Sequence, residues 1–339
     1  MGTASERVGV PHAYSVPEPG LGMPVALIRV TRFSQHLAPH KPGIGGATAG
    51  GPGGWGPSGT VTPRRHNVPM VLPRVIATDL DGTLLDQNGQ VSPRNHRALT
   101  AAVEAGVRVV IVTARPPRTT EPFAAMFDCA AVVCGNGAHT QLPGEAEPLV
   151  RAIDRDTSGT IVEKLRFSLP GLGFGVETGT DFYHDTDYHL EPWIRAEWVK
   201  GVLDGTDALL TAATPVTKLI ARSKQYPVHE MYEAAVTAVG TLAEPTYSGG
   251  AGLVEISAAG VNKGSTLAML CERWGVDREE VVAFGDMPND RSALTWAGSG
   301  YAMSSGHRDL LDPALGLRVA PSSFEDGVGR VVEEILERA

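Results

Sequence analysis

Hydrophobic residues beyond position 74 form short apolar runs that alternate with amphipathic stretches. The runs at 75–78, 107–112 and 131–134 are rich in Val, Ile and Ala, which is typical of buried strands in a parallel sheet. Between the first two, residues 92–106 carry a Ser-Pro helix start, one apolar helical face and a closing glycine. Strand, helix and strand in this order predict an α/β fold whose core is a doubly wound parallel sheet.

The regular alternation is interrupted in the middle of the chain. There the pattern predicts strands and helices of a different arrangement, with strands at 174–177, 217–221 and 253–256 and helices near 191–199 and 228–239. From Lys263 the alternation resumes with a helix, a strand at 281–284 and a closing helix. We therefore expect one sheet domain formed by residues 74–140 and 258–339, with a separate α+β module inserted at 141–257.

The first 73 residues differ from the rest in composition and charge. They hold 13 of the 40 glycines and 11 of the 25 prolines, together with six Lys/Arg and two Glu. Such a segment buries too little apolar surface to offset its chain entropy, so we expect a disordered extension at 1–73. The net charge of −9 divides into +4 for this extension and −13 for the remainder. An acidic body argues against nucleic acid as a partner, because phosphate backbones require clustered positive charge.

Cysteine content and hydropathy bear on the compartment. The three cysteines, Cys129, Cys134 and Cys271, lack the paired spacing of a zinc site or a disulfide framework. No apolar run approaches the roughly 18 residues that a spanning helix needs. These features predict a cytoplasmic protein without a membrane partner, and they carry no prediction of oligomeric state.

Chemically active side chains follow several of the expected strands. Asp79 and Asp81 come directly after the first strand, and Thr113 follows the second. Asp286 follows a later strand, and Lys263 begins the helix after the insert. Two aspartates at this spacing are more often solvated turn residues, and each of the other positions also has an ordinary structural interpretation. Their joint placement favours function, because ligands of doubly wound sheets bind beyond the carboxyl ends of the strands.

These residue types suit the transfer of a phosphoryl group. Asp79 would attack phosphorus and form an aspartyl-phosphate, while Asp81 would protonate the leaving alcohol and later deprotonate the attacking water. Mg²⁺ suits a site of Asp79, Asp286 and backbone oxygen, because it prefers oxygen ligands. Thr113 and Lys263 would bind the transferring group, and Lys263 would also offset the mutual repulsion of the carboxylates.

The order of these motifs resembles that of the haloacid dehalogenase (HAD) superfamily. The segments that carry the resemblance are DLDGT at 79–83, Thr113 in IVTARPP, Lys263 in GVNKGSTL and GDMPND at 285–290. CGNGAH at 134–139 and EDGVGRVVEEIL at 325–336 are similar to segments of its Cof-type phosphatases in particular. The resemblance covers about residues 74–339 and implies a Rossmann-like core with an inserted α+β cap domain.

The resemblance also implies roles for individual residues. Asp79 is implied as the nucleophile, Asp81 as the acid/base that offers its backbone carbonyl to Mg²⁺, and Asp286 as a side-chain ligand of the ion. Asn289 is implied in binding the substrate phosphate, together with Thr113 and Lys263. The residues implied to support the site are Gly82, Thr83, Arg115 and Asp290.

The leading functional hypothesis is a Mg²⁺-dependent phosphatase that acts on a small phosphorylated metabolite, and the resemblance favours sugar phosphates. One alternative is a phosphomutase, which would return the phosphoryl group to a sugar instead of to water. Another is a noncatalytic protein that binds a phosphorylated ligand. Asp81 argues against this last alternative, because a binding module has no need of an acid/base residue.

Two features of the insert have competing interpretations. The segment HDTDYH at 184–189 is interpreted as a polar loop that could touch substrate, because it lacks the tight histidine spacing of a second metal site. Lys218 is interpreted as a solvated flank of its strand, with contact to a substrate anion as the alternative.

Overall fold

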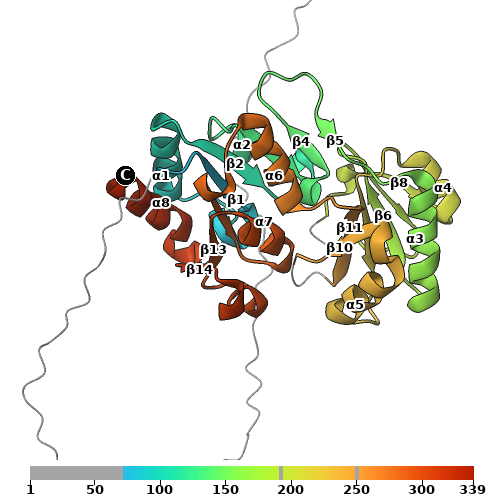
Figure 1. Ribbon diagram of the computed structural model, residues 1–339. Helices are drawn as coiled ribbons and strands as arrows, with labels where there is room; N and C mark the ends of the chain where they lie inside the picture. The colour runs from blue at the N-terminus through green and yellow to red at the C-terminus, as the bar shows by residue number, and fades with distance from the viewer. Residues whose placement is uncertain (1–71, 191–193, 249–251) are drawn as a thin grey trace, which may run out of the picture.

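Two sheets with helices packed on them make up the described part of the chain, which the computed structural model covers at residues 72–190, 194–248 and 252–339 (Figure 1). Most of the expected extension, residues 1–71, lies outside the described residues. None of the described helices is long and apolar enough to cross a membrane.

The larger sheet has eight strands and forms the core. Its strands, in spatial order, are β14 (Arg318–Ala320), β13 (Ser299–Met303), β12 (Val281–Gly285), β1 (Val75–Thr78), β2 (Arg108–Val112), β3 (Ala131–Cys134), β4 (His139–Gln141) and β5 (Leu149–Val150). The strands from β14 to β3 run parallel, whereas β4 and β5 continue the sheet in antiparallel pairing. The central strand β1 is buried along its whole length, so the residues that follow it lie at the middle of the sheet edge.

Helices cover both faces of the core sheet. On one face α1 (Pro93–Glu104) packs beside α8 (Gly327–Arg338), so segments from opposite ends of the described chain lie side by side (Figure 1). On the other face α6 (Lys263–Trp274) packs with α7 (Arg291–Trp296). Ser92 caps α1 by accepting a hydrogen bond from the backbone of Asn95, as its sequence signal predicts. The doubly wound parallel core predicted from the alternation of runs is confirmed.

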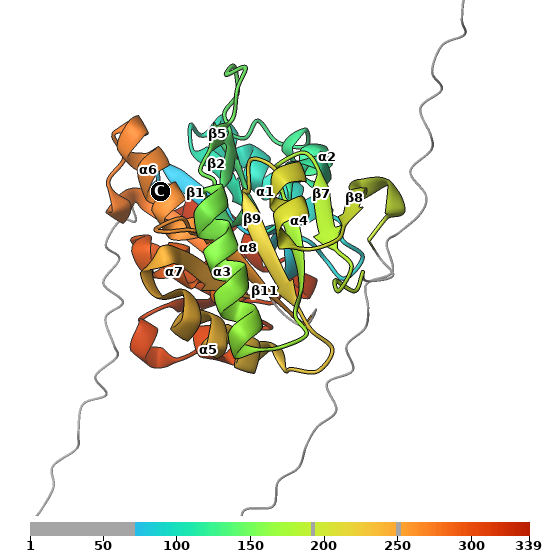
Figure 2. The same cartoon turned by 90° about the vertical axis from the view of Figure 1, so that its right-hand side faces the viewer.

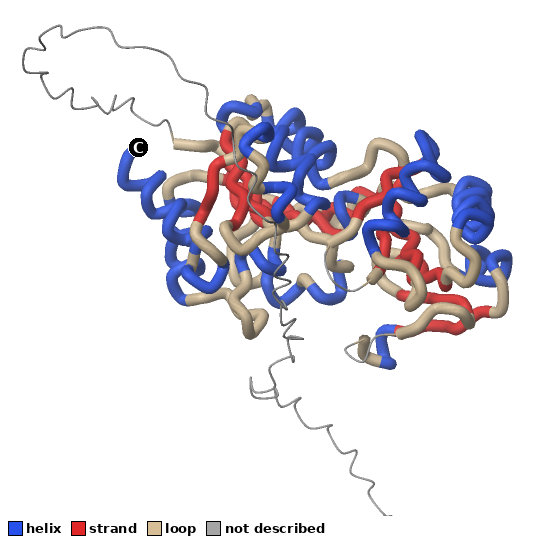
Figure 3. Tube along the Cα trace, turned by 90° about the horizontal axis from the view of Figure 1, so that it is seen from below, coloured by secondary structure: helices blue, strands red, loops and turns tan. Residues whose placement is uncertain are grey.

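The second, six-stranded sheet belongs to the cap. Its strands, in spatial order, are β10 (Ala243–Thr246), β11 (Leu253–Ala258), β9 (Lys218–Arg222), β6 (Gly173–Glu177), β7 (Phe182–Asp185) and β8 (Val199–Leu203). The cap helices α3 (Arg155–Ser168), α4 (Thr206–Ala212) and α5 (Val228–Val239) lie in front of this sheet in Figure 2, on the side away from the core. Core and cap each have their own group of strands with helices packed on it (Figure 3).

Side-chain alternation gives the cap sheet two different faces. Residues such as Leu219 and Ala221 point into the apolar cluster beneath the cap helices. The alternate positions carry buried polar groups, among them Glu177, Lys218 and Glu255. These three contact loops of the core, so the second face of the cap sheet is turned toward the carboxyl edge of the core sheet.

The structure corrects two details of the sequence interpretation. The core sheet continues through β4 and β5 to Val150, so Gln141, Leu149 and Val150, which we assigned to the insert, pair with strands of the core. The two strands are too short to give a clear periodic signal. The helix expected near 191–199 is also wrong over its described part, which holds a single helical turn, Ala196–Trp198, before β8 begins. Pairing with β7 at the edge of the sheet overrides the local pattern.

Candidate active site

The loop after β1 brings carboxylates to the centre of the sheet edge. Asp79 directly follows the strand, and Leu80–Leu84 forms a helical turn in which Gly82 has a left-handed backbone, with φ of +74°. A Cβ on Gly82 would overlap the carboxylate of Asp286, so only glycine lets the two loops approach this closely. Thr83 donates a hydrogen bond from Oγ1 to Asp286 Oδ1 at 2.8 Å, which holds that carboxylate in place.

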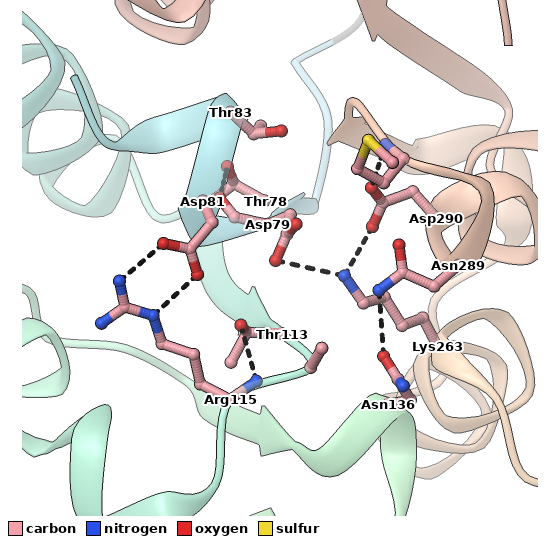
Figure 4. Close-up of polar contacts among 12 residues, drawn as sticks. Thr78, Asp79, Asp81, Thr83, Thr113, Arg115, Asn136, Lys263, Asn289 and Asp290 are labelled. Carbon is pink, nitrogen blue, oxygen red and sulfur yellow. Dashed lines mark hydrogen bonds and ion pairs between the residues drawn. The ribbon is translucent and has the colours of Figure 1, made fainter. Parts of the chain in front are cut away.

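A buried ammonium group links two of the carboxylates. Lys263, which is 1% exposed, begins α6, and its Nζ lies 3.1 Å from Asp79 Oδ1 and 2.6 Å from Asp290 Oδ1 (Figure 4). Burial would lower the pKa of Lys263, but the charges of Asp290 and Asp79 outweigh it and raise the pKa above its usual value. The lysine is therefore held as a cation between its two partners.

Asp290 also shapes the loop that follows β12. Its Oδ2 accepts hydrogen bonds from the backbone N–H groups of Asp286, at 3.0 Å, and Met287, at 2.9 Å. Both oxygens of Asp290 are thus engaged, one by the loop and one by Lys263. The side chain thus holds the loop after β12 and the ammonium of Lys263 together.

Negative charge is concentrated at this edge. Carboxylate oxygens of Asp79, Asp286 and Asp290 lie within 4.8 Å of one another, and all three residues are buried. Burial, opposed by Lys263 and reinforced by Asp290 and Asp81, raises the pKa of Asp79 to about 7. Burial and the charges of Asp290 and Asp79 raise the pKa of Asp286 well above its usual value. Such a group of hard oxygen donors fits a divalent cation, which would offset the repulsion.

Asp81 points in a different direction from this group. Its carboxylate accepts two hydrogen bonds from Arg115, at 2.7 Å from Nε and 2.6 Å from Nη2 (Figure 4). Burial would lower the pKa of Arg115, but Asp81 raises it above the usual value. The buried Thr113 accepts a hydrogen bond at Oγ1 from the backbone N–H of Arg115, at 3.1 Å. The side chain of Asp81 lies outside the three-carboxylate group.

Asn289 completes the set of predicted residues and brings in one that sequence reasoning missed. Its Nδ2 donates to Oδ1 of Asn136 at 3.1 Å (Figure 4). Asn136 lies in the turn Gly135–Gly137 after β3 and has a left-handed backbone, with φ of +57°. The GNG sequence was a signal for such a turn, although it gave no role for the side chain.

A cavity of about 70 Å³ lies where these elements meet. Its lining consists of Asp79, Asp81, Thr113, Ala114, Ser248, Met287 and Asn289. Ser248 comes from the cap, so the cap contributes directly to the wall of the cavity. Sequence reasoning missed Ser248, because no motif marks it.

The structure also shows the surroundings of the two insert features that had competing interpretations, Lys218 and residues 184–189. Lys218 is not a solvated flank, because it is 4% exposed and its Nζ donates to Glu255 Oε1 at 2.5 Å and to the backbone oxygen of Ala114 at 2.9 Å. In the 184–189 segment, Asp185 binds Arg166 and backbone N–H groups. The segment lies outside the potential metal-binding group found among the described residues.

Comparison with known proteins shows the family. A family model for haloacid dehalogenase-like hydrolases matches residues 76–332, which is more than half of the chain. The chain belongs to this family. The fold and the motif order agree, so the resemblance to Cof-type HAD phosphatases is confirmed.

Relatives of this HAD hydrolase include named phosphatases. A pyridoxal phosphate phosphatase of Escherichia coli (strain K12) is 30% identical over 68% of this chain and 88% of its own length. A 5-amino-6-(5-phospho-D-ribitylamino)uracil phosphatase of Bacillus subtilis (strain 168) is 25% identical over 77% of this chain and 97% of its own length. The solved structure of SMU.1108c from Streptococcus mutans UA159 has 25% identity and a TM-score of 0.68, covering 78% and 99% of the two chains. The chain is a phosphoric monoester hydrolase of the HAD type.

Proposed function

We propose that this HAD hydrolase cleaves small phosphate monoesters through an aspartyl-phosphate on Asp79. The observation that carries the proposal is the buried Lys263, whose ammonium lies between Asp79 and Asp290 beside the cavity at the sheet edge. A carboxylate held next to a cation can approach an anionic phosphoryl group at a lower electrostatic cost.

The reaction needs one proton carrier in addition to the nucleophile. As Asp79 Oδ attacks phosphorus, Asp81 donates a proton to the leaving oxygen, and the alcohol departs. Asp81 then takes a proton from water, which attacks phosphorus and releases inorganic phosphate from Asp79. Arg115 holds the Asp81 carboxylate at the cavity wall through two hydrogen bonds, and release of this contact would free a carboxylate oxygen of Asp81 to carry the proton. Thr113, Asn289 and Lys263 bind the phosphoryl oxygens.

The donor set at the edge fits Mg²⁺. Asp79 and Asp286 would hold it through side-chain oxygens and Asp81 through its backbone carbonyl. When bound, Mg²⁺ supplies positive charge that offsets the buried carboxylates and the phosphoryl group. Gly82 and Thr83 contribute by keeping Asp286 close to the loop after β1.

For the substrate we propose a small phosphorylated metabolite, with sugar phosphates as the first class to test. The small volume of the cavity favours a substrate whose phosphorylated end is compact, and the cap residue Ser248 lies in the cavity wall. The named relatives act on pyridoxal phosphate and on a phosphorylated ribityl compound, so these two phosphate esters belong in the same screen.

A phosphate-release screen with and without Mg²⁺ tests the proposal. Wild type should release inorganic phosphate from at least one ester, and only with the metal. Asp79→Asn should lose this activity while remaining folded, because the amide cannot attack phosphorus. Asp86→Asn is a matched control, since Asp86 lies in the same segment but accepts backbone hydrogen bonds from Asn88 and Gln90 in a turn. Full turnover by Asp79→Asn would refute the mechanism.

A further inference from the structure

A line of hydrogen bonds connects the cap sheet to the proposed phosphate site. Glu255 on β11 accepts a hydrogen bond at Oε2 from Asn136 Nδ2, at 3.2 Å. Asn136 in turn accepts one at Oδ1 from Asn289 Nδ2, at 3.1 Å (Figure 4). All three side chains are buried, and Asn289 lines the active-site cavity. A cap residue is thus two hydrogen bonds away from a side chain that lines the cavity.

The backbone of Asn136 marks it as a constrained position. Its φ of +57° is left-handed, a conformation that asparagine adopts more readily than most residues other than glycine. Its N–H donates to the backbone oxygen of Thr113 at 3.0 Å, so the turn is anchored to the loop after β2. The turn therefore presents the Asn136 side chain from a backbone that is fixed on the core.

The carboxylate of Glu255 determines which group donates and which accepts in both hydrogen bonds. A carboxylate can only accept hydrogen bonds, whereas an amide has one donating and one accepting end. Glu255 therefore turns the NH₂ group of Asn136 toward itself and the oxygen of Asn136 toward Asn289. That oxygen in turn requires a donor, which sets the orientation of the Asn289 amide. Reversal of any one amide would place two donors or two acceptors in contact.

Glu255 is held in its ionised form. Burial alone would raise its pKa, but the charge and hydrogen bond of Lys218, together with hydrogen bonds from Asn136 and Ser248, hold the pKa below its usual value. Lys218 lies 2.5 Å from Glu255 Oε1, and it also binds the backbone oxygen of Ala114 in the core. A carboxylate with this partner remains an acceptor under the conditions of catalysis.

Resting on the proposed function, we propose that Glu255 is a positioning residue of the HAD site, which acts through Asn136 to orient the amide of Asn289. One N–H of Asn289 is used by Asn136, and its second N–H is directed to a phosphoryl oxygen. With the amide reversed, the carbonyl oxygen of Asn289 would meet the phosphoryl oxygens and repel them. Through these contacts the cap orients a phosphate-binding side chain of the core, and it also forms part of the cavity wall.

Variants that exchange the hydrogen-bond donor and acceptor between positions 255 and 136 test whether the direction of these hydrogen bonds matters for activity. Glu255→Gln removes the constraint, because a glutamine amide can donate to Asn136 as well as accept from it. Asn136→Asp places two carboxylates in contact. The double variant restores the direction: the aspartate at 136 accepts from both the new glutamine and Asn289, and the number of charges is unchanged. Aspartate also tolerates the left-handed backbone.

We expect each single variant to lower kcat/KM at least about tenfold, since loss of one oriented donor to a transition state typically costs 10² to 10³. The double variant should return to within about threefold of wild type, whereas independent effects would multiply to about a hundredfold loss. The assay is Mg²⁺-supported hydrolysis of p-nitrophenyl phosphate, with melting temperatures measured in parallel. A double variant that loses as much as the product of the singles overturns the proposal.

Two further variants separate positioning from stability. Glu177→Gln is the matched control, because Glu177 is also a buried cap carboxylate that binds a core cation, Arg118, but it has no link to Asn289. It should keep kcat/KM within about twofold of wild type; a loss equal to that of Glu255→Gln overturns the proposal. Asn136→Gly suits the left-handed backbone, so it should fold and still lose activity. Full activity in Asn136→Gly also overturns it. Wild type without phosphate release would instead refute the proposed function.

Discussion

Removal of the Lys263 ammonium is the most informative perturbation of the site's electrostatics. In Lys263→Met the apolar side chain keeps a similar length and flexibility but brings no charge. Asp79 and Asp290 then lose the cation that lies 3.1 and 2.6 Å from their oxygens. Because these residues are buried, water cannot replace the lost partner at full strength.

The size of the effect follows from these distances. At an effective dielectric constant of 20, Coulomb's law gives about 5 to 6 kcal/mol for each contact, and much of this is offset by the cost of burying the charges. Removal of one partner from a buried pair typically costs about 3 to 5 kcal/mol. Uptake of protons by the carboxylates moderates the loss, since the pKa of Asp79 is already raised to about 7 by burial and neighbouring charge. We therefore expect about 3 kcal/mol, which corresponds to a fall in Tm of roughly 6 to 12 °C.

Thermal unfolding with and without saturating Mg²⁺ measures this loss and its origin. A bound cation would offset the carboxylates in place of the ammonium, so Mg²⁺ should recover part of the Tm lost in Lys263→Met. Lys218→Met is the matched control, because it also removes a buried lysine from a carboxylate partner, but in the cap and away from the three aspartates. Its Tm should fall, and Mg²⁺ should raise it only as much as it raises the Tm of wild type, whereas Lys263→Met should gain more. An unchanged Tm in Lys263→Met, or equal recovery in both variants, would show that the electrostatic reasoning is wrong.

Two further predictions concern the close approach of Gly82 to Asp286 and the pH dependence of the stability that Glu255 contributes. Gly89→Ala should lose about 1 to 2 kcal/mol of stability, because φ is +70° at this position. Gly82→Ala, at φ of +74°, should lose more, because a Cβ there also overlaps Asp286. Steady-state phosphate release should fall only in Gly82→Ala, whose methyl group overlaps Asp286, since nothing lies within 4 Å of a Cβ at Gly89. Lys218 and its other hydrogen-bond partners outweigh burial and hold the pKa of Glu255 below its usual value, so Glu255 stabilises the protein at neutral pH and loses this contribution as the pH falls through its folded pKa. The Tm difference between wild type and Glu255→Gln should therefore shrink from pH 7 to pH 3; a constant difference would contradict this assignment.

The core could be predicted from the sequence better than the cap, because the sequence patterns that mark its elements are local. The strand β1, the cap of α1 by Ser92 and the residues that follow the strands are all encoded within a few positions of one another. Parallel strands bring such residues to one edge, so the approach of Asp79 to Asp286 could be expected from topology alone. The cap was harder to predict. Helix α3 was missed although Asp154 caps it, since the apolar positions that it buries are interrupted by polar residues.

The relation between cap and core depends on contacts that no local pattern encodes. Asn136 and Glu255 are 119 positions apart, and their hydrogen bond requires both the turn after β3 and the register of β11. Lys218 illustrates the same limit. A lysine on a strand is ordinarily solvated, and only the partner on the neighbouring strand explains why this one is buried.

The charge balance of the two parts explains how an acidic protein can accept a phosphate ester. On the cap face, Glu255 is paired with Lys218 of the cap and Glu177 with Arg118 of the core, so neither carboxylate faces the substrate as an unpaired charge. In the core, Arg115 neutralises Asp81, while Asp79, Asp286 and Asp290 share Lys263 as their ammonium partner. Among these groups, the unbalanced negative charge thus lies on the three buried aspartates. A divalent cation would balance that group, and a phosphoryl group would then meet cations and amide donors in place of unpaired carboxylates.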